Sequence, residues 1–205
     1  MKTPIVLLAA ALMLSACAEL PSTTSTPATG GQLATAVARS VEQGGKFISL
    51  VGPKRQHAEP FLGVAGTNFF ALRSMLDTRT GETVHQLFVE DSYFGAERNW
   101  EAARDGQGRT LRFIAISKNE ITCENGCSYA EEFGAAIPET LLRAGPQGFA
   151  VSFTAHSGAT MAVTVPGDLV ANQLKAVADA RAALPSAAAT PPPPAASPPP
   201  ATATR

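Results

Sequence analysis

The sequence predicts a mainly β (α+β) fold, an antiparallel sheet or sandwich of hairpins with an N-terminal and a C-terminal helix. Two observations predict it. From Lys46 onward, short runs alternate between apolar and polar residues and are separated by glycine-containing turns, which is typical of half-buried strands. At both ends of this region, apolar residues recur at helical spacing instead. Successive hairpins with helices confined to the ends favour antiparallel pairing.

One helix is expected at each end. Over Gln32–Gln43, the apolar residues Leu33, Val37 and Val41 recur every four positions, and Gly44-Gly45 follows as a stop signal. Over Asp168–Leu184, the first residue is placed to cap the helix, and an apolar stripe is placed to pack on the sheet. That stripe consists of Leu169, Val170, Leu174 and Val177. A short helical turn is also expected over Pro138–Ala144, with the proline at its first position.

The strands are expected to form hairpins. The predicted partners are Phe69–Asp77 with Thr83–Asp91, Trp100–Arg104 with Arg109–Ser117, and Phe149–Thr154 with Thr160–Val165. Glycine-containing turns at Thr80-Gly81, 105–108 and 156–158 separate the partners. The alternation is clearest in Phe149–Thr154 and Thr160–Val165, so these two strands should each have one dry face and one wet face.

The first 17 residues, MKTPIVLLAAALMLSAC, resemble the signal peptide of a bacterial lipoprotein. Lys2 supplies a positive charge, Ile5–Leu14 is an apolar run too short to span a bilayer, and Leu14-Ser15-Ala16-Cys17 matches the lipobox. The resemblance implies that Cys17 becomes the lipidated N-terminus, carrying acyl chains such as palmitate that anchor the protein. Ala18 implies the outer membrane of the cell envelope, on its periplasmic face. The alternative is an ordinary secretory signal with Cys17 as a bystander.

Composition divides the remainder of the 205-residue chain into three parts. Residues 18–31 are a Ser/Thr/Pro/Gly tether, residues 32–184 a single mainly β globular domain, and residues 185–205 a Pro-rich tail. The tether and the tail have too few apolar side chains to offset the entropy of ordering, so we expect both to be disordered. For the tail, a solvated segment is favoured over a ligand for an aromatic groove, because Arg205 is its single charged residue.

The segment Cys123-Glu124-Asn125-Gly126-Cys127 is expected to close a hairpin with a disulfide. Gly126 supplies the left-handed residue that a three-residue hairpin loop requires, which places Cys123 and Cys127 across from each other. Export to an oxidising compartment would favour their pairing. A redox centre normally uses C-x-x-C at a helix N-terminus, and a metal site would need two further ligands. We therefore predict a structural disulfide and no metal site.

The chain offers few signals of catalysis. Nucleophile-elbow, H-E-x-x-H, phosphate-loop and dinucleotide motifs are missing from the sequence, and no cofactor is predicted. A net charge of -1 argues against nucleic acid or an anionic surface as the main partner. The histidines are scattered: His57 is expected in a loop, His85 as a partly buried, hydrogen-bonded histidine on the strand face of Leu87 and Val89, and His156 in a turn.

The charged residues in the strands are expected to be structural. The members of the acidic pairs Glu90-Asp91 and Glu131-Glu132 point to opposite faces, so neither pair presents two acids to one substrate. Arg73 shares a strand face with apolar neighbours such as Met75. A structural ion pair with a carboxylate on the next strand is the favoured interpretation of Arg73, and a binding-site arginine is the alternative.

The stretch from FLGVAGTNFFALRSMLDTRTGETVHQLFVEDSYFG through ITCENGCSYAEEF is similar to uncharacterised proteobacterial envelope lipoproteins that share the hairpin, the C-x-x-x-C segment and the closing helix. This resemblance implies no activity, and only the role of Cys17 transfers. Two hypotheses stay open. The preferred one is a non-enzymatic envelope module with an envelope protein or the cell wall as partner. The alternative is a periplasm-facing hydrolase or carbohydrate-processing enzyme that gathers distant residues such as Glu59, Asp91, Glu131 and His85.

Overall fold

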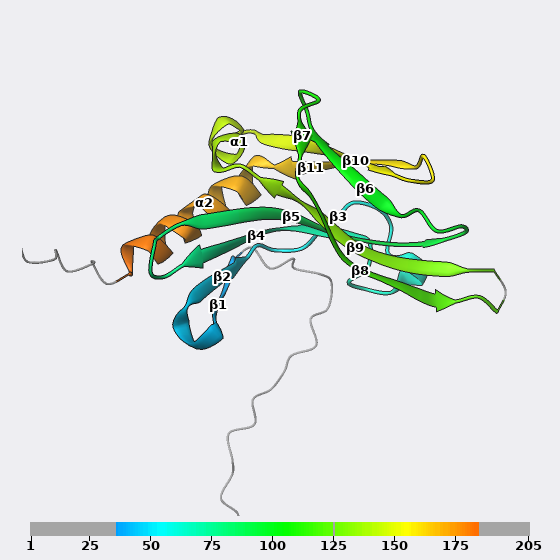
Figure 1. Ribbon diagram of the computed structural model, residues 1–205, viewed down its shortest axis with the longest axis horizontal. Coiled ribbons are helices and arrows are strands. Elements are labelled where there is room, and N and C mark those ends of the chain that lie inside the picture. The colour runs from blue at the N-terminus through cyan, green and yellow to red at the C-terminus, as the bar shows by residue number, and fades with distance from the viewer. Residues whose placement is uncertain (1–35, 125, 185–205) are drawn as a thin grey trace, which may run out of the picture. The chain divides into compact units, whose positions relative to one another are not determined.

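The computed structural model describes residues 36–124 and 126–184 (Figure 1). Cys17, the tether over 18–31 and the tail over 185–205 lie outside these residues. Within them, strands dominate and every strand pair is antiparallel, so the predicted mainly β antiparallel class is confirmed.

The strands form two sheets. In chain order the strands are β1 (Ala38–Glu42), β2 (Phe47–Val51), β3 (Arg55–Gln56), β4 (Phe69–Asp77), β5 (Thr83–Phe94), β6 (Trp100–Asp105), β7 (Thr110–Leu111), β8 (Phe113–Thr122), β9 (Ser128–Ile137), β10 (Gly148–Ala155) and β11 (Thr160–Pro166). The large, seven-stranded sheet has the order β1-β2-β4-β5-β9-β8, with β3 paired to β4. The small, four-stranded sheet has the order β11-β10-β6-β7.

The small sheet and the C-terminal helix α2 (Gly167–Ala182) lie side by side on one face of the large sheet (Figure 1). The main core forms between the sheets around Phe133, whose ring centre is 5.2 Å from that of Trp100 and 5.0 Å from that of Phe153. A smaller core joins α2 to β2 and β4 through Ile48, Leu50, Leu76, Val177 and Ala180. Within residues 36–124 and 126–184, no α-helix or second sheet covers the opposite face of the large sheet, which we call the open face; the 57–68 loop, with the 3-10 turn η2 (Phe61–Gly63), lies on this face beside β5.

The predicted N-terminal helix is wrong over the part of it that the structure describes. Ala38–Glu42 is the edge strand β1, which pairs with β2. The 3-10 turn η1 (Gln43–Gly45), with positive φ at all of its residues, reverses the chain between these strands. Residues four positions apart share one face of a strand as well as one face of a helix, because four is a multiple of the strand period. The spacing of Val37 and Val41 was therefore compatible with both structures.

The two other helices lie close to their predicted bounds. In α2, the stripe residues Leu169, Val170 and Val177 are buried as expected. Its N-cap is Pro166, however, and Asp168 lies in the first turn, where its carboxylate is 3.6 Å from the Arg55 guanidinium. The short helix α1 (Glu139–Ala144) likewise has its proline at the N-cap and not at the first helical position. Both helices begin after proline, which fixes φ near the value that a helix entry requires.

The expected partner of β6 is only partly correct. β6 pairs with the two-residue β7, and after Arg112 the chain continues as β8 in the large sheet, where it pairs with β9. The other two hairpins form as predicted, β4 with β5 and β10 with β11. The long pairing of β5 with β9, from His85↔Ile137 to Phe94↔Ser128, joins strands that are distant in sequence.

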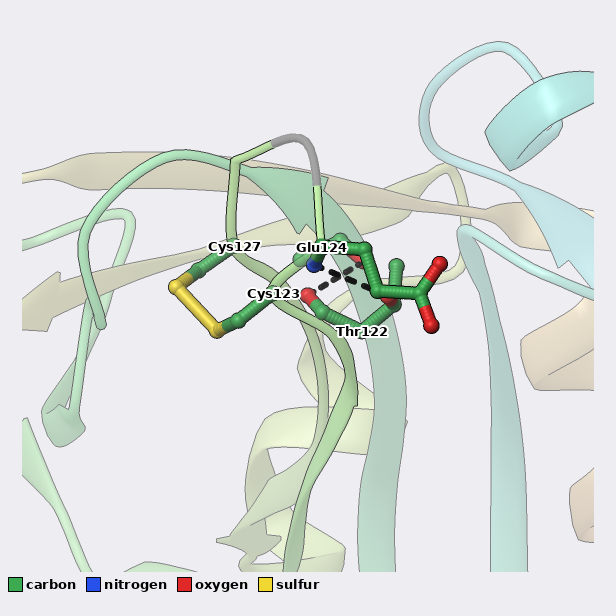
Figure 2. Close-up of a disulfide and its surroundings, with 5 residues drawn as sticks. Thr122, Cys123, Glu124 and Cys127 are labelled. Atoms are coloured by element: carbon green, nitrogen blue, oxygen red, sulfur yellow. Dashed lines mark hydrogen bonds between the residues drawn. A yellow bond between two sulfur atoms is a disulfide. The ribbon is translucent and has the colours of Figure 1, made fainter.

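The Cys123–Cys127 disulfide closes the tip of the β8–β9 hairpin (Figure 2). The next register pair is Thr122↔Ser128, and Gly126 has φ +104°, as the predicted loop requires.

We expect the Cys123→Ser, Cys127→Ser double variant to lower the free energy of unfolding by about 2 kcal/mol, because so short a loop removes little entropy from the unfolded chain. Denaturant unfolding measures this loss, and hydrogen exchange should place the added mobility at the hairpin tip. Loss of folding altogether would contradict a register-fixing role.

Candidate functional site

The open face of the large sheet carries a hollow of about 300 Å³. Its lining combines apolar residues with polar ones and with two arginines: Ser49, Val51, Arg73, Ser74, Met75, Val84, His85, Gln86, Arg112 and Ile114. β9 runs between β5 and β8, and its Gly134 is the register partner of both Phe88 and Ile114. A Cβ atom at Gly134 would lie 2.4 Å from the Leu87 carbonyl oxygen, so only glycine fits. The Gln86 side chain, which lines the hollow, lies over Gly134, because its Nε2 would be 2.9 Å from such a Cβ atom.

Arg73 has an unusual environment in this hollow. Its guanidinium carbon lies 3.4 Å from the centre of the Phe88 ring. Its buried Nε has no hydrogen-bond partner, and no carboxylate lies within ion-pair distance among the residues that the structure describes. Burial lowers the pKa of Arg73, and the negative charge of Glu132 opposes this effect. An arginine in a protein nevertheless stays charged.

The predicted structural ion pair of Arg73 is therefore wrong for residues 36–124 and 126–184. The residues opposite Arg73 are Val51 on β2 and Gln86 on β5, and neither is acidic. Glu132 is on the same face, and its carboxylate accepts a hydrogen bond from Ser117 Oγ at 3.0 Å. A buried donor without a partner typically costs about 1–3 kcal/mol. Arg73 thus presents unused donors at the wall of the hollow.

The β5–β9 pairing brings two buried carboxylates together on the covered face. Asp91 and Glu131 are register partners and are 3% and 5% exposed. Glu131 accepts hydrogen bonds from the Tyr93 hydroxyl and from the backbone N–H groups of Asn99, at 3.0 Å, and Trp100, at 3.1 Å. Burial, assisted by Glu131, raises the pKa of Tyr93, which keeps the hydroxyl protonated as a donor. Glu131 therefore fixes the connection between β5 and β6.

Asp91 has a similar structural task. Its carboxylate accepts hydrogen bonds from Trp100 Nε1 at 2.9 Å and from the Arg98 guanidinium at 2.7 Å. On the opposite face, Glu90 accepts hydrogen bonds from the Asn68 backbone N–H and the Ser92 hydroxyl, which holds the 57–68 loop against β5. Sequence reasoning correctly placed the members of each acidic dipeptide on opposite faces. It missed that the two dipeptides pair with each other across β5 and β9.

His85 belongs to a separate buried cluster. Its Nδ1 lies 2.8 Å from Ser74 Oγ, which confirms the predicted hydrogen-bonded histidine; at 5% exposed, His85 is more deeply buried than the partly buried position that we expected. Gln173 Nε2 donates to the same Ser74 oxygen at 2.7 Å. The His85 Nε2 atom lies 3.6 Å from the Glu139 carboxylate. Burial lowers the pKa of His85, because it disfavours the charged ring.

The series Ser74, His85 and Glu139 has the residue types of a hydrolytic triad, but its surroundings are structural. Ser74 is 3% exposed, and its hydroxyl oxygen accepts a hydrogen bond from Gln173 of α2. A nucleophile must reach a substrate, which this position prevents. The cluster instead joins β4 and β5 to both helices. Ser74, Gln173 and Glu139 were not singled out from the sequence, because their proximity depends on how α1 and α2 pack.

Glu139 is the charged anchor of this cluster. Its carboxylate accepts hydrogen bonds from Arg181 Nη2 at 3.0 Å and from Arg143 Nε at 2.9 Å. These contacts, Arg181 first, lower its pKa from 4.5 to about 2. The unfolded chain therefore binds this proton more readily than the folded protein does between pH 4.5 and pH 2. The contribution of Glu139 to stability is complete above pH 4.5 and is lost as the pH falls towards 2.

We expect Glu139→Gln to lower the free energy of unfolding at pH 7 by about 2 kcal/mol, after allowance for screening by solvent. The difference between this variant and the wild type should shrink steadily as the pH falls below 4.5. Urea unfolding at a series of pH values measures this, with Glu82→Gln, an exposed position, as control. A difference that stays constant down to pH 2 would contradict the ion-pair account.

The other predicted polar residues do not converge. Glu131 lines one hollow and His85 lines two others, so no single hollow contains both side chains. Glu59 is exposed and contributes its backbone carbonyl oxygen, which accepts from the Asn68 amide at 2.7 Å. His57 Nε2 lies 2.7 Å from the Glu90 carbonyl oxygen, and His156 is exposed in its turn. Residues 36–124 and 126–184 contain no group of three or more side chains that could hold a metal ion.

Comparison of the chain with protein-family models, with curated proteins and with solved structures gave no match. Among the described residues, neither helix has the length and apolar character needed to cross a membrane. Function must therefore be inferred from the chemistry of the residues themselves.

Proposed function

We propose that this chain is a lipid-anchored protein of the bacterial cell envelope whose β domain binds another envelope component through the open face of the large sheet. In this proposal, Cys17 carries the lipid at the outer membrane, residues 18–31 separate the lipid from the domain, and the domain acts by binding. The partner is an envelope component, and nucleic acid is not among the candidates because the net charge of the chain is only -1.

The observation that carries the proposal is the environment of Arg73. Apart from Arg73 and Arg112, the wall of the hollow combines four apolar residues with four polar ones. The apolar residues are Val51, Met75, Val84 and Ile114, and the polar residues are Ser49, Ser74, His85 and Gln86. A concave, mainly apolar surface with a few polar groups aimed into it is the usual form of a binding site. Arg73 supplies the polar group, and its stacking on Phe88 holds the guanidinium in one place before any ligand arrives.

The buried carboxylates favour binding over hydrolysis. A general acid or base has to come within hydrogen-bond reach of the substrate. Asp91 and Glu131 are almost fully buried, and protein donors already occupy their oxygens. His85 is equally buried and contacts Ser74. Of the residues named for the enzymatic alternative, only Glu59 is exposed.

The anchor is tested by Cys17→Ser in the full chain. We expect incorporation of labelled palmitate to stop and the protein to move from the membrane fraction to the soluble periplasm. The Cys123→Ser, Cys127→Ser double variant keeps Cys17 and is the control, which should stay labelled. If Cys17→Ser stayed in the membrane fraction without incorporating labelled palmitate, something other than a lipid on Cys17 would attach the protein to the membrane. That result would favour an ordinary secretory signal.

The open face is tested by photocrosslinking in cells from the full-length protein. A photoreactive residue replaces Val84, which is 64% exposed at the hollow, or Thr154, an exposed residue of the small sheet. We expect reproducible adducts, detected by gel shift and by intact mass, from position 84 and not from position 154. Equal adducts from both positions, or none from position 84, would refute binding at the open face.

A further inference from the structure

We infer that the hollow on the open face takes an amphiphile with an oxyanionic head, a carboxylate or a phosphate ester, on a single apolar chain. The inference rests on the proposed binding role and names the chemical class of the ligand. It follows from the combination of Arg73 and Arg112 with the apolar Val51, Met75, Val84 and Ile114, while Ser49, Ser74, His85 and Gln86 complete the lining.

The two arginines select the head of the ligand. Neither guanidinium takes part in an ion pair or hydrogen bond among the residues that the structure describes, although Arg104 and Arg109, on the small sheet and in its turn, both find partners. Guanidinium groups bind carboxylate and phosphate oxygens through paired N–H donors. Because Phe88 fixes the plane of the Arg73 guanidinium, its free edge is aligned before binding. An oxyanion at the hollow would satisfy the donors that the protein leaves without a partner.

The remaining walls select the body of the ligand. Val51, Met75, Val84 and Ile114 come from different strands, and Met75 and Val84 are among the large exposed apolar side chains of the chain. A volume of about 300 Å³ lies at the lower end of the range for ligand sites. One medium-length alkyl chain suits this volume better than a lipid with two long chains.

The charge distribution argues against a large polyanion. A polyanion is held by a broad positive field, whereas the chain has a net charge of -1 and the acidic Glu132 lies on the same face as Arg73. Two arginines beside one carboxylate leave a local net positive charge, which suits a ligand with a single anionic head. A ligand without an apolar part would bury no apolar surface against the side chains beside the arginines.

The test is isothermal titration of the full chain carrying Cys17→Ser, which needs no detergent that could compete for the site. The probes are decanoate, decyl phosphate, decanol and acetate. We expect decanoate or decyl phosphate to bind at least tenfold more tightly than decanol and acetate, because the head and the chain are both needed. The better of the two anions identifies the head.

Arg73→Met should weaken binding of the anionic probes at least tenfold, to the level of decanol, and Val84→Glu should abolish it. Arg79→Met removes the same charge from an exposed turn and is the matched control, which should bind like the parent chain. The unfolding midpoint of each variant shows whether it is folded. If Arg73→Met is unstable, Arg112→Met removes the other positive charge of the hollow in its place.

Equal affinity for decanoate and decanol, or unchanged binding in both arginine variants, would overturn the inference. Failure of every probe, with adducts still forming from position 84 in cells, would overturn the ligand class and leave the binding role standing. Failure of the probes together with failure of the adducts would overturn both.

Discussion

Replacing Glu131 with leucine is expected to lower the free energy of unfolding by about 3–5 kcal/mol. The substitution leaves the Tyr93 hydroxyl and the N–H groups of Asn99 and Trp100 without their buried acceptor. Each orphaned buried donor costs about 1–3 kcal/mol, and water can recover only part of this. Because a typical domain is stable by only about 5–15 kcal/mol, the loss should be visible as a large fall in the denaturant midpoint.

Glu120→Leu is the matched control for this prediction. Glu120 is exposed on the neighbouring strand β8, and an exposed substitution of this kind usually changes stability by less than about 0.5 kcal/mol. The comparison also separates the two functional hypotheses. A carboxylate kept for catalysis is commonly a burden on stability, so a variant as stable as the wild type, or more stable, would point back to an enzymatic role for Glu131.

Phe133→Ala is expected to cost about 3–5 kcal/mol, the usual range for removing a large aromatic ring from a core. Phe133 is almost fully buried between the two sheets, where its ring contacts those of Trp100, Phe113 and Phe153. Truncation leaves a cavity that these large neighbours cannot fill without shifting the small sheet. The loss should therefore appear in the unfolding free energy and in the near-ultraviolet circular dichroism of Trp100.

Phe94→Ala removes the same atoms from an exposed position at the end of β5. We expect its cost to stay below about 1 kcal/mol, because most of that ring already meets water. Similar losses for Phe133→Ala and Phe94→Ala would show that the core is not centred between the two sheets.

Local signals in the sequence were sufficient for much of the fold. The β4–β5 hairpin follows from two strand-like runs on either side of the Thr80-Gly81 turn signal, and α2 follows from its apolar stripe. Gly126 between two cysteines correctly predicted the disulfide-closed hairpin tip. The N-terminal helix failed because a spacing of four residues fits a strand face equally well, and edge pairing with β2 decides the outcome.

The candidate site depended on pairings that local patterns do not reveal. The sequence placed Arg73 on the correct strand face, but its neighbours Val51 and Gln86 are set by the registers of β2 and β5. A carboxylate at position 51 or 86 would have formed an ordinary ion pair with Arg73. The proximity of Asp91 and Glu131 likewise requires the pairing of β5 with β9, which are separated by two intervening strands of the small sheet and by β8.

Binding at the open face is best measured by native mass spectrometry of the full chain carrying Cys17→Ser, purified from the periplasm without detergent. We expect a reproducible non-covalent adduct of a small amphiphile on the parent chain and on Arg79→Met, and its loss from Arg73→Met. A parent chain without any adduct, or the same adduct on Arg73→Met, would contradict binding at the open face.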